Sequence, residues 1–192
     1  MHIRSQISKL KRDTATLSYD RADAVKTLKA MGYKELGRGA FAVAMMHPEA
    51  PDVVVKVSQW RSGRGHVKAA GYVDGFGKYV WWLDASRTRS KFALKVYHHR
   101  QISRCNGDTF ITITERCYPG KGAKAQRSVT VAQHVMSGIR FKGEPDVNSW
   151  ALKYLRRLTL DTGAKLDLHG ANVMLRRDGS PVITDPLILR GY

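Results

Sequence analysis

The β-branched run from Val53 to Val57 constrains the fold more than any other feature of this sequence. Val53-Val54-Val55-Lys56-Val57 has the composition of a buried β-strand, interrupted by a single lysine. Residues 33–46 before it have the pattern of strand, glycine turn and strand, and Pro48 to Asp52 supply a second turn. Together these segments predict a three-stranded antiparallel meander.

Helices and a hairpin are expected around this meander. Residues 20–31 predict a helix that Asp20 caps and Gly32 ends, with an apolar side made of Leu17, Ala22, Val25 and Leu28. Residues 65–85 predict a second helix, although three glycines weaken it. Residues 94–104 and 109–116 alternate like strands, and Asn106-Gly107 between them is a strong hairpin signal.

The second half of the chain predicts a linker, a helix and a short hairpin. Residues 118–126 are rich in glycine and lysine, which is typical of a linker or hinge. Residues 148–161 form an amphipathic pattern, in which the apolar positions are Trp150, Leu152, Leu155 and Leu158. Residues 173–175 and 182–184 predict two strands around an Asp178-Gly179 turn. Strands early and helix plus hairpin late indicate a two-lobed α+β protein, with domains at 1–117 and 118–192.

Charge and composition limit the partners. The chain has 33 Lys and Arg against 16 Asp and Glu, a net charge of +17, which attracts acidic proteins, phosphates or nucleic acid. Only the charge supports binding to nucleic acid, since no zinc-finger spacing or aromatic RNA-binding motif occurs. No apolar run has the length of a membrane span, and the first residues lack a signal-peptide pattern, so we expect a cytosolic protein without membrane contact. Cys105 and Cys117 are expected to be reduced structural thiols.

Two blocks of residues carry chemistry. Near the C-terminus, Asp167-Leu168-His169-Gly170-Ala171-Asn172 precedes a hairpin and then Thr184-Asp185-Pro186. Near the N-terminus, the glycine turn from Leu36 to Phe41 precedes the strand with Lys56. Phosphoryl transfer needs phosphates held in place, a metal that bridges their oxygens and a carboxylate that orients the attacking hydroxyl. In chain order, the two blocks offer residues for each of these tasks. Turn capping is the alternative use of such Asp and Asn residues.

In these blocks the chain resembles the protein-kinase superfamily, in which D-x-x-x-x-N is followed by a hairpin and a magnesium-binding Asp. The D-L-H-G-x-N form is similar to that of antibiotic and small-molecule kinases. A closer resemblance is to the early protein kinases of T7-like lytic bacteriophages (autographiviruses), which phosphorylate host proteins. The resemblance spans residues 33–187 and implies a two-lobed protein-kinase-like fold with an antiparallel-sheet N-lobe and a truncated C-lobe.

The resemblance implies a role for each residue of the late block. Asp167 would be the catalytic base, Asn172 and Asp185 would bind Mg²⁺, and His169 would neutralise charge on the transferred group. It further implies ATP as phosphoryl donor, host proteins as substrates and the host cytoplasm as location.

For the early block, the resemblance implies a nucleotide site. Gly37 and Gly39 would lie over the phosphates, Lys56 would contact the α- and β-phosphates, and Val43 and Val54 would line the adenine. Residues 114–117 fall where kinases have their hinge, so the backbone of Glu115 and Cys117 would hold the adenine edge.

Some features depart from the kinase pattern. The third loop glycine is Ala42, and no glutamate lies between Glu49 and Glu115 to pair with Lys56, which leaves Asp74 on the predicted 65–85 helix as the substitute. The chain ends at Tyr192, which predicts a C-lobe without an activation segment. The apolar tail from Leu187 to Leu189 is expected to pack on this small lobe or to form a homodimer.

Four functions stay open at this point. The leading one is an ATP- and Mg²⁺-dependent Ser/Thr protein kinase acting on acidic host proteins. The others are a kinase-fold protein that binds and inhibits a host factor, a small-molecule phosphotransferase, and a basic nucleic-acid-binding module.

Overall fold

Two compact units make up the chain in a computed structural model, which describes residues 2–17, 20–59, 72–103, 108–120, 123–136, 149–169 and 171–190. The first unit comprises Met1–Asp74, Lys95–Arg116 and Arg190–Tyr192, and the second comprises Gly75–Leu94 and Cys117–Leu189. The chain is an α+β protein, as expected, with five helices and a five-stranded antiparallel sheet in the described residues. One boundary between the units falls between Arg116 and Cys117, and residues 75–94 belong to the second unit.

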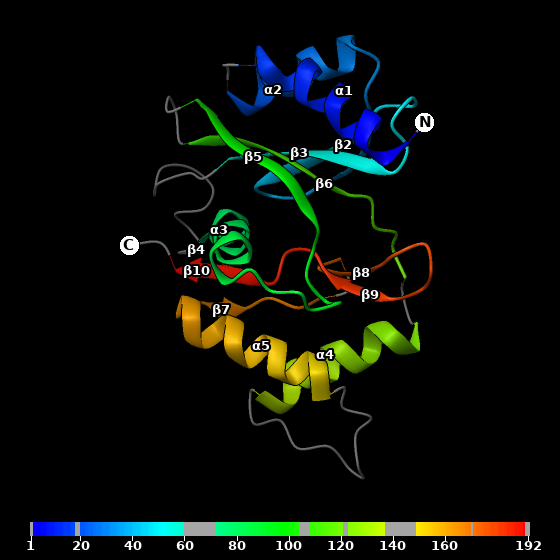
Figure 1. Ribbon diagram of the computed structural model, residues 1–192. Helices are drawn as coiled ribbons and strands as arrows, with labels where there is room; N and C mark the ends of the chain where they lie inside the picture. The colour runs from blue at the N-terminus through cyan, green and yellow to red at the C-terminus, as the bar shows by residue number, and fades with distance from the viewer. Residues whose placement is uncertain are drawn as a thin grey trace. The chain divides into compact units, whose positions relative to one another are not determined.

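The main element of the first unit is an antiparallel sheet (Figure 1). Its strands, in spatial order, are β1 (Lys34–Arg38), β2 (Ala42–Met46), β3 (Val53–Gln59), β6 (Thr109–Glu115) and β5 (Val96–Ser103). The predicted meander is confirmed as β1-β2-β3, and the two later predicted strands are confirmed as the pair β5 and β6. The predicted Asn106-Gly107 turn lies outside the described residues.

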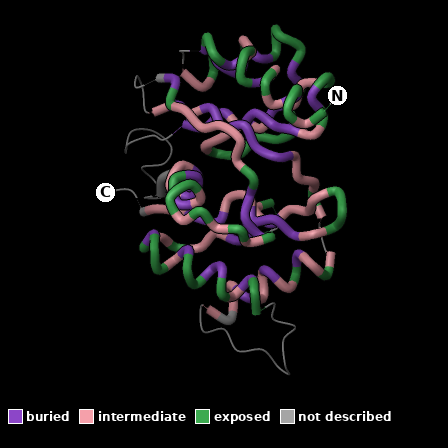
Figure 2. The backbone as a smooth tube through the Cα atoms, in the orientation of Figure 1, coloured by how far each residue is buried: buried purple, intermediate pink, exposed green. Residues whose placement is uncertain are grey.

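Two helices cover one face of this sheet: α1 (Ile3–Ala15) and α2 (Arg21–Ala30). Asp20 caps α2 as predicted, accepting from the amides of Ala22 and Asp23, and Gly32 at φ 87° ends it in a conformation that favours glycine. Ala22 is exposed, however, and Ala24 takes the predicted inward place. Figure 2 shows the buried residues concentrated along the strands and exposed residues on the outer turns of these helices.

The core under the helices is built from alternate residues of the strands. Val53, Val55 and Val57 of β3 are fully buried against a cluster that includes Leu10 of α1 and Leu28 of α2. In a strand, side chains alternate between the two faces. The opposite face of the sheet therefore carries Val54 and Lys56.

The predicted helix over 65–85 is wrong in its first half. Residues 72–74 form strand β4 (Tyr72–Asp74), and the helix α3 spans Phe76–Ser86; residues 65–71 lie outside the described residues. Gly75 separates the two elements, and a Cβ at this position would clash with the backbone of Leu187. Glycine at this position therefore allows the backbone of Leu187 to approach closely at the point between β4 and α3.

The second unit contains α3, α4 (Lys124–Met136), α5 (Ser149–Thr162) and four short strands. These strands are β7 (Lys165–Leu166), β8 (Val173–Leu175), β9 (Pro181–Ile183) and β10 (Leu187–Arg190). The predicted hairpin is confirmed as β8 and β9, with Gly179 at φ 80° in its turn. The apolar tail lies in β10, which pairs with β7, so Leu187 is buried within its own chain.

Helices α4 and α5 differ in part from expectation. The predicted linker ends early because residues 124–126 already form the first turn of α4, where buried Gln126 donates to the carbonyl of Val173. The helix predicted over 148–161 is confirmed as α5, and Leu155 and Leu158 are buried as expected. Trp150, in the first turn of α5, is instead exposed. Among the described residues, no helix has the length and apolarity needed to cross a membrane.

Candidate active site

The residues predicted to carry chemistry in the second unit lie between two short strand pairs. Leu166 of β7 is opposite Leu187 of β10, and Val173 of β8 is opposite Ile183 of β9. The segment 167–172 therefore runs beside the segment 184–186, with paired strands at both ends. Antiparallel pairing at both ends sets the register of the two loops.

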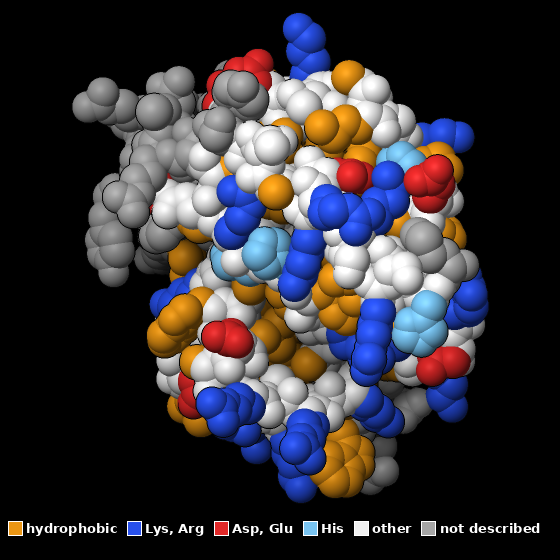
Figure 3. All heavy atoms as spheres, turned by 45° about the horizontal axis from the view of Figure 1, so that its top comes forward, with side chains coloured by type: hydrophobic (Ala, Val, Ile, Leu, Met, Phe, Trp, Pro, Cys, Tyr) orange, Lys and Arg blue, Asp and Glu red, His pale blue; other side chains and the backbone are white. Residues whose placement is uncertain are grey.

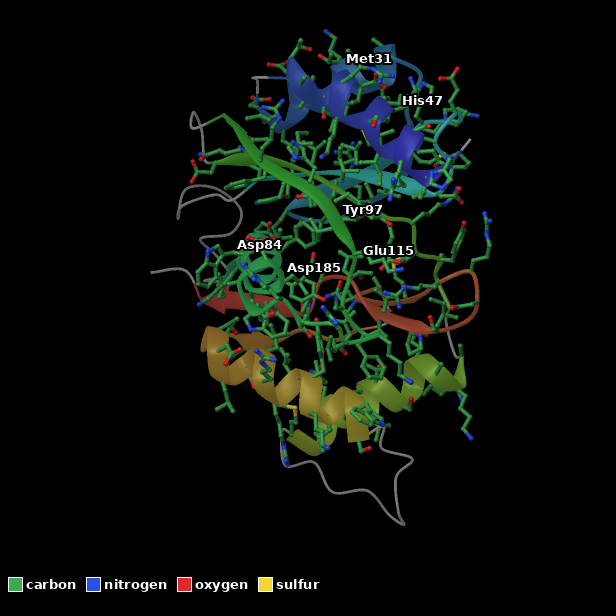
Figure 4. The ribbon with its side chains drawn as sticks, in the orientation of Figure 1. Met31, His47, Asp84, Tyr97, Glu115 and Asp185 are labelled. Carbon is green, nitrogen blue, oxygen red and sulfur yellow. The ribbon has the colours of Figure 1, made fainter. Side chains whose placement is uncertain are left out.

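Backbone hydrogen bonds join these two loops directly. The Asp167 amide donates to the Pro186 carbonyl at 2.7 Å, and the Thr184 amide donates to the Asn172 carbonyl at 2.9 Å. The Thr184 hydroxyl donates to the same carbonyl at 3.1 Å. Asp185, which lies between Thr184 and Pro186, is thus held between the two ends of the other loop (labelled in Figure 4). The structure brings together the three residues that the sequence predicted as base and metal ligands.

Side-chain contacts orient the carboxylate and the amide of the first loop. Asn172 Nδ2 donates to the Asp167 carbonyl at 2.6 Å and to Asp167 Oδ2 at 3.4 Å. Oδ1 is the atom of Asn172 that can bind a cation, because the amide nitrogen is only a hydrogen-bond donor. The Asp167 carboxylate is 41% exposed, so a substrate group can reach it.

His169 lies in the same loop, with its Nε2 3.8 Å from Asp167 Oδ2. Its Nδ1 accepts from the Ala171 amide at 3.3 Å, which places the proton of the neutral ring on Nε2, the nitrogen nearer the carboxylate. The imidazole is 59% exposed. It therefore forms a donor at the edge of the loop. Gly170 lies outside the described residues.

A buried tyrosine supports the strand that leads to Asp185. Tyr79 of α3 donates its hydroxyl proton to the Ile183 carbonyl at 2.8 Å, and the Tyr154 hydroxyl lies 2.9 Å from the Tyr79 hydroxyl oxygen. Burial raises the pKa of both phenols, so both hydroxyls keep their protons and donate. Tyr79 was not identified from the sequence. The only indication of its role in the sequence was an aromatic residue within the helix predicted over 65–85.

The donor set fits a small hard cation. Among the described residues, no group of three or more His, Cys, Asp or Glu side chains is close enough to hold a metal ion. Magnesium in phosphotransferases is held by one or two protein oxygens together with substrate phosphates and water. The Asp185 carboxylate and the Asn172 amide oxygen match that smaller set.

In the first unit, Lys56 lies on the sheet face opposite the helices. One residue from each strand forms a row across the sheet, in the order Gly37, Ala44, Lys56, Thr112, His99. The Thr112 hydroxyl is 2.8 Å from Nδ1 of His99, and burial lowers the pKa of that imidazole. Lys56 is therefore the one cation of this row at neutral pH, flanked by small or neutral side chains. We call this row with Val54 the Lys56 face.

Val43 is a correction to the predicted nucleotide site. Its side chain is fully buried in the core under α1 and α2, and it is opposite Val57. It therefore points away from the Lys56 face, and neighbouring Ala44, opposite Lys56, takes its place. The alternation of the strand was the signal that would have identified Ala44 from sequence.

The glycine turn lies between β1 and β2. The Gly39 amide donates to the Ala42 carbonyl at 2.8 Å, so this N–H serves the turn and is not available to a phosphate. Arg21 of α2 donates to the Ala40 carbonyl at 3.0 Å and holds the turn from outside. Neither Gly37 nor Gly39 has a positive φ, and a Cβ added at either would meet nothing closer than 4.0 Å. The described fold therefore does not itself require glycine at these two positions.

At the predicted hinge, both backbone groups of Glu115 take part in hydrogen bonds within the chain. The Glu115 amide donates to the Lys95 carbonyl at 3.0 Å, so only its carbonyl can meet an adenine edge, and that oxygen already accepts from the Thr114 hydroxyl. The Glu115 carboxylate accepts from the Lys95 amide at 2.9 Å. Cys117 is a half-buried free thiol, as expected; Cys105 lies outside the described residues.

Asp74 is not on a helix, contrary to the sequence prediction. It is the last residue of β4 and is 9% exposed. Its pairing with Lys56 stays a prediction.

Comparison with models of known protein families and with curated protein sequences finds no match to this chain.

Proposed function

We propose that this protein is an ATP- and Mg²⁺-dependent phosphotransferase, namely a bacteriophage Ser/Thr protein kinase that phosphorylates host proteins in the host cytoplasm. One observation carries the proposal. Two strand pairs join the loop 167–172 to the segment 184–186, so that Asp167, Asn172 and Asp185 belong to one hydrogen-bonded arrangement. The likeness of these residues to the kinase motifs supports the same function.

Asp167 is the base in this proposal. Its carboxylate accepts the proton of a substrate hydroxyl while that oxygen bonds to the γ-phosphorus of ATP. The bond from this phosphorus to the β,γ-bridging oxygen breaks, and ADP leaves with the electron pair. The Asn172 amide, which bonds the carbonyl and carboxylate of Asp167, holds this side chain in position.

Asn172 and Asp185 are the proposed magnesium ligands. Mg²⁺ held by these two residues would supply positive charge that offsets the charge of the phosphates. The protein's part is to hold two oxygen donors in a fixed relation, which the hydrogen bonds from Thr184 to the Asn172 carbonyl do. His169 Nε2 would donate to the transferred group.

Lys56 is assigned to the phosphates of ATP, and the glycine turn would lie over them without a hydrogen bond from the Gly39 amide, which serves the turn. An ammonium group on a face of small, neutral side chains suits an anion, and the Lys56 face offers Ala44 and Val54 for contact with the adenine. Glu115 would accept from the adenine edge through its carbonyl, and Cys117 would supply a further backbone group.

Acidic proteins are the proposed substrates, because the chain carries a net charge of +17. Figure 3 shows many more Lys and Arg than Asp and Glu side chains on the visible face. A protein that binds and inhibits a host factor without phosphotransfer is the second candidate, and the assay below separates the two.

The test is incubation of the protein with γ-labelled ATP, Mg²⁺ and host lysate. Asp167→Asn should lose labelling by a factor of at least about a hundred, the range for general base catalysis, while ATP binding is kept. The matched control is Asp178→Asn, an exposed aspartate in the turn of the same unit, whose bond to the Ser180 amide an asparagine can also make.

Three outcomes are informative. Loss of labelling in Asp167→Asn alone supports the kinase. Normal labelling by Asp167→Asn excludes this residue as the base. A wild-type protein that labels nothing but captures a host protein favours the inhibitor.

A further inference from the structure

The outer face of α5 carries exposed apolar side chains at both ends. Trp150 is 68% exposed and Leu160 is 83% exposed, although the inner face of the same helix buries Ala151, Leu155 and Leu158 in the second unit. Large apolar side chains on a surface mark interaction sites when they form part of an organised patch.

Cations lie between these two apolar ends. Trp150, Lys153, Arg157 and Leu160 are spaced by three, four and three residues, which places them along one side of a helix, with Arg156 beside them. With a rise of about 1.5 Å per residue, the apolar ends are about 15 Å apart. We call these five residues the α5 stripe.

Contacts within the stripe leave most of its charge available. Lys153 Nζ lies 5.2 Å from the Trp150 ring centroid, and Arg157 pairs with Asp161 at 3.5 Å. Asp161 also accepts from Trp82 at 2.8 Å. Lys153 and Arg156 have no acidic partner in the part of the chain that the structure describes.

We propose that the α5 stripe is a docking surface for an acidic, amphipathic helix of a partner protein. The apolar residues of such a helix cover Trp150 and Leu160, and its carboxylates meet Lys153, Arg156 and Arg157. This matches the way in which amphipathic helices bind, through anchors spaced along one helical side. The inference does not depend on phosphotransfer, because α5 contributes no residue to the proposed chemistry.

Other occupants fit the stripe less well. A second copy of the chain would place equal positive charges against each other, since each chain carries +17. Single-stranded nucleic acid binds through stacked aromatics and a continuous basic groove. The α5 stripe has one aromatic side chain, that of Trp150. Its other apolar residue is Leu160, which has no ring on which a base could stack.

The experiment uses a fluorescein-labelled synthetic peptide of about 18 residues, five helical turns. In it, leucine and phenylalanine recur every three to four residues and Glu and Asp fill most other positions. Binding to the full-length chain is measured by fluorescence anisotropy. A peptide of the same composition, shuffled so that its apolar residues spread around the helix, tests the requirement for amphipathicity.

The variants come in matched pairs. Trp150→Ala should raise the Kd at least about tenfold, the effect of losing an aromatic anchor, and Leu160→Ala should also raise it. Trp81→Ala, a control at a tryptophan that is 66% exposed on α3, should leave the Kd unchanged.

Charge reversal is tested in the same way. The double variant Lys153→Glu and Arg156→Glu should weaken binding more than Lys11→Glu and Arg12→Glu, which change the net charge equally on the exposed side of α1. All these side chains are exposed, so the fold should be kept, and thermal unfolding checks this.

Three results overturn the proposal. Equal weakening by the two charge-reversal pairs means unspecific attraction to a basic protein. Equal binding of the shuffled peptide means that no helix is recognised. Tighter binding of a thymidine oligonucleotide, weakened by the same stripe variants, assigns the surface to nucleic acid.

Discussion

Replacing Tyr79 with phenylalanine tests whether a buried hydroxyl holds the strand that precedes Asp185. The phenol oxygen has one proton and two lone pairs, and all three are used. The proton goes to the Ile183 carbonyl at 2.8 Å, so Tyr154 must be the donor at 2.9 Å, and the Leu94 amide donates at 3.4 Å. The ring itself, stacked 6.3 Å from Trp82, is kept in the variant.

The cost follows from these bonds. Each hydrogen bond stabilises by about 0.5–1.5 kcal/mol, and a buried group left without its partner costs about 1–3 kcal/mol. The variant leaves the buried Ile183 carbonyl and the Tyr154 hydroxyl without this partner, so we expect the free energy of unfolding to fall by about 2–4 kcal/mol. Tyr154→Phe removes one bond and leaves Tyr79 bound to Ile183, so it should cost about 1 kcal/mol.

Urea unfolding followed by far-UV circular dichroism and by tryptophan fluorescence measures both variants. The reasoning requires Tyr79→Phe to be clearly the less stable of the two. If both variants lose the same free energy, the bond to Ile183 contributes nothing, and Tyr79 acts only through its ring.

Three further predictions concern other parts of the molecule. Asp185→Ala should remove the Mg²⁺ dependence of ATP binding in a titration with and without the ion, and an unchanged dependence would exclude it as a ligand. Ala44→Phe should weaken ATP binding at least about tenfold by filling the Lys56 face, whereas Val43→Ala should lower the free energy of unfolding by about 2 kcal/mol and leave ATP affinity unchanged; the reverse pattern would restore Val43 to the site. Arg38 donates two bonds of 2.9 Å to Glu35 and, with Lys29, lowers the pKa of that carboxyl to about 2. The pair's contribution to stability is therefore present above the unfolded pKa of Glu35 and lost as the pH falls toward 2, and Arg38→Gln should raise this pKa in an NMR titration.

Much of the local structure could be predicted because its signals are local. The valine run of β3, the Asp20 cap and the Asp178-Gly179 turn act over a few residues, and each was found in its predicted element. The strand pair β8 and β9 after Asn172 was predicted for the same reason, whereas strand β7 before Asp167 was not predicted.

Helices α1 and α4 were missed because they bury polar residues. Gln6 of α1 is 1% exposed, and it donates to Asp52 at 2.8 Å and accepts from the Asp52 amide at 2.9 Å. Gln126 of α4 is buried against the Val173 carbonyl. A buried glutamine is stable only when a distant partner meets its hydrogen bonds, and no local pattern names that partner.

The sequence by itself determined the order of strands and turns, the excess of positive charge and the spacing of the candidate catalytic residues. Only the tertiary structure decided which side of an element faces the core: Val43 is buried and Ala44 is opposite Lys56, and Trp150 is exposed while Leu155 is buried. An apolar side chain lowers the free energy when it leaves water, but side chains on several faces of one element can do so. The neighbours that cover a face are brought there by residues far along the chain, as α1 and α2 are brought over β3.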